Sequence, residues 1–160
     1  MILGVIPARL NSTLFPSKVI FPLKGKPIIE HVYDKALQSD LLSKVIVAVD
    51  SEETKNVINC QNIMMTSDKH QSGTDRVAEV ANNFDCDIVV NIQGDEPGID
   101  PLLIDQLITL FDDPNVEMAS IASTDLEEDD LNNDNVVKVN LDKENNAISF
   151  IRNNLNPDLT

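Results

Sequence analysis

Short apolar runs rich in valine and isoleucine alternate along the chain with segments whose apolar residues recur at helical spacing. Ile28, Val32 and Ala36 recur in this way, at the spacing of one helix face. The apolar runs predict strands over residues 2–7, 44–50, 62–67, 87–93 and 116–123, and the periodic segments predict helices over residues 27–40, 51–59, 73–84 and 101–113. This alternation indicates a three-layer α/β fold with a mostly parallel sheet.

Cap residues predict where the helices begin. Pro27 and Pro101 suit a first helical turn, Ser51 suits an N-cap, and Thr74 or Asp75 is expected to open the third helix. The pattern changes after residue 123. Residues 124–135 are acidic and rich in asparagine, which predicts a solvated loop or a short helix, and residues 136–152 alternate like a β-hairpin that turns near residues 144–146.

Charge and composition limit the function classes. Lys plus Arg is 12 and Asp plus Glu is 27, so the formal net charge is −15, which argues against nucleic-acid binding. A phosphate ligand would need a local group of cations or a divalent metal ion. No apolar run approaches the roughly 20 residues that span a bilayer. The start of the chain lacks the features of a signal peptide, so a cytoplasmic protein without a membrane partner is expected.

Two cysteines, Cys60 and Cys86, lie far apart and form no metal or redox motif. Ligands of open α/β sheets bind beyond the carboxyl ends of the strands. The loops that follow the predicted strands are therefore where candidate residues should be sought.

The loop after the first strand carries Arg9, Ser12 and Lys18. The chain contains neither GxGxxG nor GxxxxGK[ST], so phosphates would be bound by side-chain cations as well as backbone N–H groups. Arginine can bind two phosphate oxygens at once, whereas lysine acts as a point charge. The alternative is a surface loop whose basic residues pair with an acidic body.

The loop that precedes the third helix contains Gln71, Ser72 and Gly73. A helix start offers free N–H groups, and a glycine allows close approach of a ligand. The alternative is simple helix capping, which would explain Ser72 without any ligand. His70 is expected to be structural or exposed, and Arg76 is expected to support the fold through a salt bridge.

The segment VNIQGDEPGID, residues 90–100, runs from an apolar strand into adjacent carboxylates. Mg²⁺ needs few protein oxygens, because waters and phosphate oxygens complete its shell. Asp95 suits this role better than Glu96, because its short side chain can be held rigidly at the end of a strand. The alternative is an Asx turn before Pro97.

Five segments resemble the 3-deoxy-manno-octulosonate (Kdo) cytidylyltransferase family: IPARLNSTLFPSK, GKPIIEHV, HQSGTDRVAEV, VNIQGDEP and VVKVNLD. The resemblance implies a Rossmann-like, GT-A type fold, with a single nucleotidyltransferase-like domain over residues 1–160. Its nucleotide-binding core would cover residues 1–123, and residues 124–160 would form the acidic loop, the hairpin and a truncated end. The implied reaction joins CTP and Kdo to give CMP-Kdo and pyrophosphate with Mg²⁺, for lipopolysaccharide synthesis.

The resemblance also assigns roles to matching residues. It implies that Arg9, Lys18 and Asp95 are catalytic, the first two as triphosphate-binding cations and Asp95 as a metal ligand. Gln93 would face the sugar acid. The nucleotide-binding set would also include residues from the first two loops, namely Ala8, Ser12, Gln71, Ser72 and Gly73.

The chain departs from the family pattern at two positions of the first loop, where Leu14 replaces a phosphate-binding arginine and Ser17 replaces a glycine. The family's second metal aspartate, further Kdo contacts and homodimer surface are expected beyond the matched part. The chain is therefore interpreted either as a fragment or as a truncated copy. Two alternative functions stay open: activation of another sugar acid, such as a sialic acid or 8-amino Kdo, and an inactive nucleotide-binding homologue.

Overall fold

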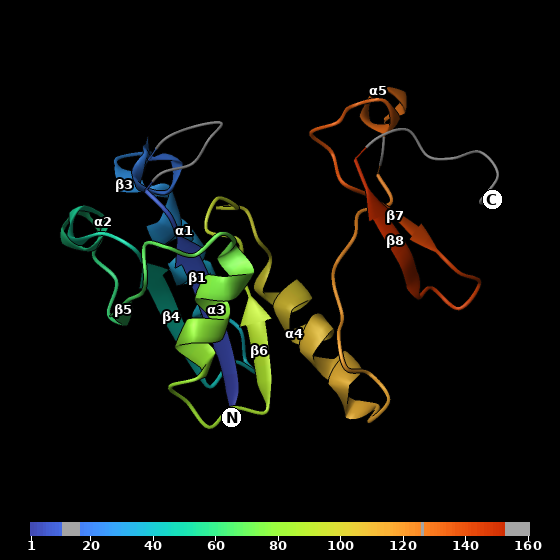
Figure 1. Cartoon of the computed structure of the whole chain (residues 1–160), viewed down its shortest axis with the longest axis horizontal. Helices are drawn as coiled ribbons and strands as arrows, with labels where there is room; N and C mark the ends of the chain where they lie inside the picture. The colour runs from blue at the N-terminus through green and yellow to red at the C-terminus, as the bar shows by residue number, and fades with distance from the viewer. Residues whose placement is uncertain (11–16, 126, 153–160) are drawn as a thin grey trace. The chain divides into compact units, whose positions relative to one another are not determined.

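The computed structural model describes residues 1–10, 17–125 and 127–152, and the chain divides into two units, Met1–Ala119 and Ser120–Thr160. The first unit contains a four-stranded sheet with the strand order β5-β4-β1-β6 (Figure 1). Its strands are β1 (Ile2–Ala8), β4 (Lys44–Val49), β5 (Ile63–Met65) and β6 (Ile88–Asn91). Every neighbouring pair is parallel, which confirms four of the predicted strands and the parallel sheet.

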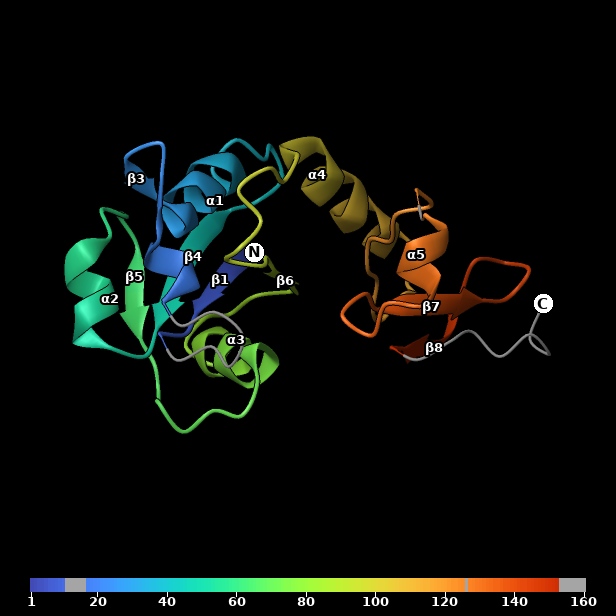
Figure 2. The same ribbon diagram turned by 90° about the horizontal axis from the view of Figure 1, so that it is seen from above.

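Helices cover both faces of this sheet. One face carries α1 (Ile28–Ala36) and α4 (Pro101–Thr109), and the other carries α3 (Gly73–Ala81), as Figure 2 shows for α1 and α3. Each face has its own buried cluster: Ile6, Val47 and Ile29 belong to the first, whereas Val5 and Val77 belong to the second. Successive β1 residues thus point to opposite faces, which explains why the central strands are apolar throughout.

Short elements complete the first unit. They are η1 (Lys18–Ile20), β2 (Pro22–Leu23), β3 (Lys26–Pro27), α2 (Glu52–Val57) and η2 (Leu110–Asp112). Strands β2 and β3 pair as a hairpin whose turn places Lys24 and Gly25 at positive φ. The sequence pattern did not predict this hairpin.

The predicted helix starts are partly confirmed. Ser51 caps α2, because its hydroxyl accepts a hydrogen bond of 3.1 Å from the backbone N–H of Thr54. Helix α3 begins at Gly73 with Ser72 as its N-cap, one position before Thr74 and two before Asp75. Pro27 stands at the N-cap of α1 and also ends β3, so it lies just outside the first turn.

The prediction of a fifth strand over residues 116–123 is wrong. These residues form no regular element, and their side chains are mostly exposed, with Met118 at 87% and Ile121 at 48%. A strand requires a neighbour to accept and donate its backbone hydrogen bonds. Within the described ranges, no strand pairs with this segment.

The second unit contains α5 (Glu128–Leu131) and an antiparallel hairpin of β7 (Lys138–Leu141) and β8 (Ala147–Ile151). The hairpin was predicted, and the short helix is one of the two alternatives predicted for residues 124–135. Asn145 occupies the turn at a φ of 66°, a left-handed conformation that asparagine tolerates. Lys138 is 2% exposed, and its ammonium donates hydrogen bonds of 2.7 Å to the carbonyl oxygens of Asn133 and Arg152.

Candidate functional site

The loops that follow β1 and β6 and the start of α3 meet at the carboxyl end of β1. Gly94 is buried there, and a Cβ atom at its position would lie 3.0 Å from the carbonyl oxygen of Pro7. A Cβ atom at Gly73 would lie 3.5 Å from Cγ of the same proline. The chain therefore brings residues 93–97 (QGDEP) and residues 72–76 (SGTDR) to the carboxyl end of β1, as a parallel sheet predicts.

Lys18 and Asp95 form an ion pair at this edge, although they lie 77 residues apart in sequence. The Lys18 Nζ atom is 2.8 Å from a carboxylate oxygen of Asp95, and the two side chains are 42% and 40% exposed. Asp95 lies in a tight turn in which the N–H of Glu96 donates to the carbonyl oxygen of Gln93, at 3.3 Å. A ligand can reach both charges, and an exposed pair of this kind contributes little stability.

Arg9 connects the first loop to the second. Its Nη1 atom donates a hydrogen bond of 3.3 Å to the carbonyl oxygen of Gln71, and both residues are exposed. Gln93 is also exposed at the end of the β6 segment. Ala8 is fully buried, so its methyl group belongs to the core, and a contact between Ala8 and a nucleotide stays a prediction. Ser12, the remaining predicted site residue, and Leu14 lie outside the described residues.

A capping box closes the start of α3. The Ser72 hydroxyl accepts from the N–H of Asp75 at 3.1 Å, and the Asp75 carboxylate accepts from the N–H of Ser72 at 3.0 Å. The Ser72 hydroxyl also donates to the Asp75 carboxylate at 2.8 Å, and this bond, followed by the one from the Ser72 backbone, lowers the pKa of Asp75. The capping role proposed as the alternative for Ser72 is therefore present, and a contact between Ser72 and a nucleotide stays a prediction.

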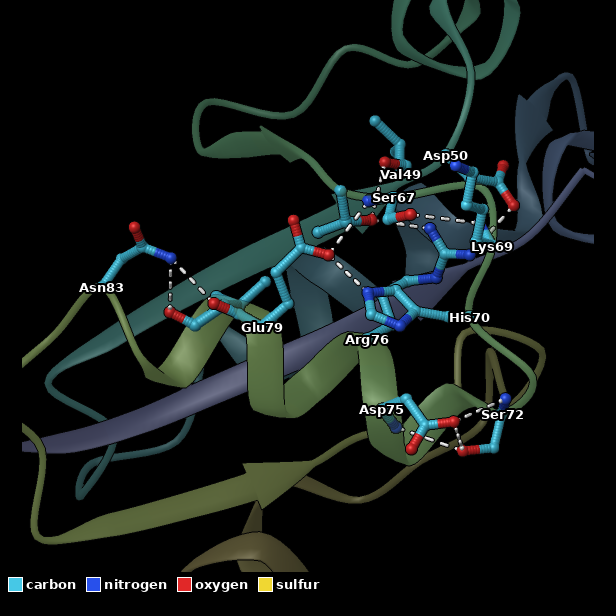
Figure 3. A network of polar contacts seen from close by, with 12 residues as sticks. Val49, Asp50, Ser67, Lys69, His70, Ser72, Asp75, Arg76, Glu79 and Asn83 are labelled. Carbon is cyan, nitrogen blue, oxygen red and sulfur yellow. Dashed lines mark hydrogen bonds and ion pairs between the residues drawn. The ribbon is translucent and has the colours of Figure 1, made fainter.

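A buried polar network lies behind these loops (Figure 3). Arg76 is fully buried and donates from Nη2 to Asp50, at 3.0 Å, and from Nη1 to the Thr66 hydroxyl, at 2.6 Å. The salt bridge expected for Arg76 is thereby confirmed. Asp50 was not singled out from the sequence, although a carboxylate directly after the buried run KVIVAV is the signal that could have found it.

His70 and Glu79 form a second polar contact on the same side of α3, as Figure 3 also shows. Glu79 accepts from the backbone N–H of Ser67 at 2.9 Å as well. These two contacts, the backbone one first, lower the pKa of Glu79. His70 thus has a structural partner, as the sequence led us to expect.

A pocket of about 390 Å³ opens beside the loop after β1. Polar and charged side chains supply most of its lining, which consists of Arg9, Leu10, Asp50, Ser51, Asp68 and His70. Its volume falls within the range of roughly 300–1,000 Å³ that is typical of small-molecule sites. Arg9 is the one lining residue that was also predicted as a phosphate-binding cation.

Comparison with known proteins identifies the family. The cytidylyltransferase family model matches residues 3–158. The chain belongs to the cytidylyltransferase family.

Curated cytidylyltransferases similar to this chain include the 3-deoxy-manno-octulosonate cytidylyltransferases of Trichlorobacter lovleyi, at 44% identity, and Geobacter metallireducens, at 43%. Each alignment covers 96% of this chain and 62% of the relative, so the chain spans less than two thirds of their length.

Solved cytidylyltransferase structures show the same fold. A structure of CMP:2-keto-3-deoxy-manno-octonic acid synthetase complexed with CTP matches with a TM-score of 0.84 at 34% identity, over 95% of this chain and 64% of that one. A cytidylyltransferase from Leptospira borgpetersenii matches with a TM-score of 0.59 at 24% identity, over 69% of this chain and 48% of that one. These matches confirm the predicted Rossmann-like α/β fold.

The carboxylates of this cytidylyltransferase suit one kind of metal site. In residues 1–10, 17–125 and 127–152, no group of three or more histidine, cysteine, aspartate or glutamate side chains is placed to enclose a metal ion. Mg²⁺ commonly uses one or two carboxylates, with phosphate oxygens and waters as the other ligands. The half-exposed Asp95 fits such a shared site. None of the described helices has both the length and the apolar character to cross a bilayer.

Proposed function

We propose that this cytidylyltransferase transfers CMP from CTP to Kdo and releases pyrophosphate, with Mg²⁺ as cofactor. The observation that carries the proposal is the identity of 43–44% to curated 3-deoxy-manno-octulosonate cytidylyltransferases across 96% of the chain. The convergence of three loops at the end of β1 supports it, because these loops hold the residues expected to bind the nucleotide. Since CTP is a cytoplasmic metabolite, we also propose that the reaction takes place in the cytoplasm.

Arg9 and Lys18 would bind the triphosphate. Both are cationic, accessible and held at the carboxyl edge of the sheet. Lys18 pairs with Asp95 in this structure, and phosphate oxygens would replace the carboxylate as its partner. Hydrogen bonds between charged groups are stronger than those between neutral groups. Such bonds from Arg9 and Lys18 would offset the repulsion between a nucleotide and a protein of net charge −15.

The same exchange would free the Asp95 carboxylate. Asp95 would then hold Mg²⁺ together with phosphate oxygens, and the chemistry that the ion supplies when bound is neutralisation of negative charge on the α-phosphate. The segments that contain Ala8 and Gln71, Ser72 and Gly73 would surround the cytidine. Gln93, exposed beside Asp95, would face the sugar acid.

The transfer itself would need little covalent work from the protein. A hydroxyl oxygen of the sugar acid forms the new bond to the α-phosphorus and gives up its proton to solvent. The bond from this phosphorus to the bridging oxygen breaks, and pyrophosphate leaves with the bonding pair. Arg9 and Lys18 would stabilise the charge that develops on the pyrophosphate. Positioning and charge stabilisation are the main sources of catalysis in such reactions.

The acceptor can be tested by incubating the protein with CTP, Mg²⁺ and a panel of sugar acids while pyrophosphate is measured. Release with Kdo alone would support the proposal, whereas release with a sialic acid or 8-amino Kdo alone would assign a different acceptor. Calorimetric titration with CTP and Mg²⁺ separates an enzyme from a binding protein. Binding without release for any acceptor would favour an inactive nucleotide-binding homologue.

The metal role is tested with Asp95→Asn, which should abolish Mg²⁺-dependent CTP binding and turnover. Asp112→Asn is the matched control, because Asp112 is an exposed aspartate on η2. Equal binding by wild type and Asp95→Asn would show that Asp95 is only a turn residue, as the alternative reading holds.

A further inference from the structure

We propose that Arg76 is a positioning residue for nucleotide binding, which acts through Asp50 on the backbone beside Arg9. The inference rests on the proposed function, since it assumes that Arg9 binds the triphosphate. It concerns a residue that does not itself need to touch the nucleotide. Hydrogen bonds connect the buried Arg76 side chain to the rim of the sheet.

Arg76 differs from the chain's other two arginines. It is fully buried, whereas Arg9 and Arg152 are exposed. Helix α3 holds it against the sheet, where its guanidinium reaches the residues that follow two strands: Asp50 after β4, and Thr66 after β5. The Thr66 hydroxyl donates onward to the carbonyl oxygen of Val49, at 2.9 Å. Arg76 thus joins the carboxyl ends of β4 and β5.

Asp50 passes this connection on to the neighbouring strand. One of its carboxylate oxygens accepts from Arg76 at 3.0 Å, and the other accepts from the backbone N–H of Leu10 at 3.2 Å. Leu10 directly follows Arg9, so the carboxylate fixes the backbone at the base of the Arg9 side chain. The Asp50 side chain is only 12% exposed, so little of it is open to water.

This arrangement is better suited to positioning than to stability. A buried ion pair gains little over an apolar replacement, because both charges must be removed from water. A guanidinium has a rigid fork of donors, so it fixes directions that a lysine ammonium cannot fix. The Arg9 guanidinium has one hydrogen bond to a protein group, at 3.3 Å to Gln71, among the residues that the structure describes. The backbone that carries it therefore contributes to its placement.

A double-mutant cycle tests the inference. Arg76→Lys keeps the charge and should lower CTP affinity in the presence of Mg²⁺ by about 10-fold, or about 1.4 kcal/mol. The same change made in an Arg9→Met background should lower it no further, because the group that Arg76 positions is then absent. Arg152→Lys, the same substitution in the second unit, is the control and should leave the affinity unchanged. Additive losses in the cycle would overturn the inference.

A second measurement does not depend on CTP. Amide hydrogen exchange at Leu10 should be faster in Arg76→Lys and in Asp50→Asn than in wild type, while Arg152→Lys should leave it unchanged. The melting temperature of each variant shows whether it is folded. Unchanged exchange at Leu10 in folded Arg76→Lys would overturn the proposed connection.

The binding cycle and the hydrogen-exchange measurement together distinguish a failure of this inference from a failure of the proposed function. If wild type fails to bind CTP, the proposed function and the role of Arg9 fail together. Faster exchange at Leu10 in Arg76→Lys would then still show that Arg76 holds this backbone. If wild type binds CTP and Arg76→Lys binds it equally well, the proposed function stands and the inference alone is overturned.

Discussion

Two ion pairs lie at the same carboxyl edge of the sheet and differ chiefly in burial. Arg76 and Asp50 have side chains that are 0% and 12% exposed, whereas those of Lys18 and Asp95 are 42% and 40% exposed. Each N–O distance is close to 3 Å, at 3.0 Å and 2.8 Å respectively, so distance alone does not distinguish them. The buried pair cannot change partners without breaking the packing around it. The exposed pair can exchange its partners for a nucleotide and a metal ion.

The comparison shows how neighbouring charges of the same kinds can serve different purposes. In the interior, an unpaired charge is so costly that both partners must stay in place. At the surface, water and salt screen the charges, so an ion pair is weak and replaceable. We therefore expect substitutions in the buried pair to change stability most, and substitutions in the exposed pair to change ligand binding most.

The largest expected effect is on stability at Asp50. Asp50→Ala should lower the free energy of unfolding by about 3–5 kcal/mol, because it leaves the Arg76 charge buried without a carboxylate. Asp95→Ala is the matched substitution in the exposed pair and should cost at most about 1 kcal/mol. Urea unfolding followed by circular dichroism measures both. Equal losses would show that burial does not distinguish the two pairs.

The next effect is on binding at Lys18. Lys18→Met should weaken CTP binding by about 1.5–3 kcal/mol, the contribution of a hydrogen bond to a charged group. Its free energy of unfolding should change by at most about 1 kcal/mol. Isothermal titration calorimetry measures the affinity, with Lys55→Met as control because Lys55 belongs to an exposed ion pair with Glu52 on α2. Wild-type affinity in Lys18→Met would remove Lys18 from the site.

Gly94 and Gly73 both lie beside Pro7 and differ in how much room a side chain would have. Gly94→Ala should cost about 1–3 kcal/mol of stability, because its Cβ would press on a carbonyl oxygen that cannot yield easily. Gly73→Ala meets Pro7 at an ordinary contact distance and lies in a helix, so it should instead gain up to about 1 kcal/mol. Thermal melting of both variants checks the opposite signs, and a loss in both would contradict the geometry.

The smallest effect concerns pH. The folded state lowers the pKa of Asp75, through hydrogen bonds from Ser72, and that of Glu79, through the backbone of Ser67 and then His70. Both carboxylates therefore stabilise the protein above their ordinary pKa values, and this stability is lost as the pH falls below about 4. Asp75→Asn should make the loss in acid less steep, as measured by urea unfolding between about pH 3 and pH 6. An unchanged slope would show that the capping box does not titrate in this range.

The sequence predicted most of the first unit because its signals are local. Strands β1, β4, β5 and β6 follow from apolar runs, and Ser51 follows from its position before a helical segment. Residues 116–123 look equally strand-like, yet they form no strand. Strand formation depends on a neighbouring strand as well as on side chains, and nothing in the segment itself shows whether that partner exists.

The candidate site was predicted residue by residue but not as a network. Lys18 and Asp95 were each expected at the rim, while their direct pairing across 77 residues was not predicted. Asp50 was missed because its importance comes from a buried arginine 26 residues away and from the backbone N–H of Leu10. No periodic pattern records such contacts, and only the fold brings these groups together.

The lengths of the strands limit how much unpaired backbone this four-stranded sheet presents, among the residues that the structure describes. The two central strands, β1 and β4, have 7 and 6 residues, whereas the outer strands β5 and β6 have 3 and 4. The sheet therefore tapers toward both sides. Short outer strands present few unpaired backbone groups to an approaching chain, which is a common protection against edge-to-edge aggregation. The taper therefore combines an apolar centre with short margins within the part of the chain that the structure describes.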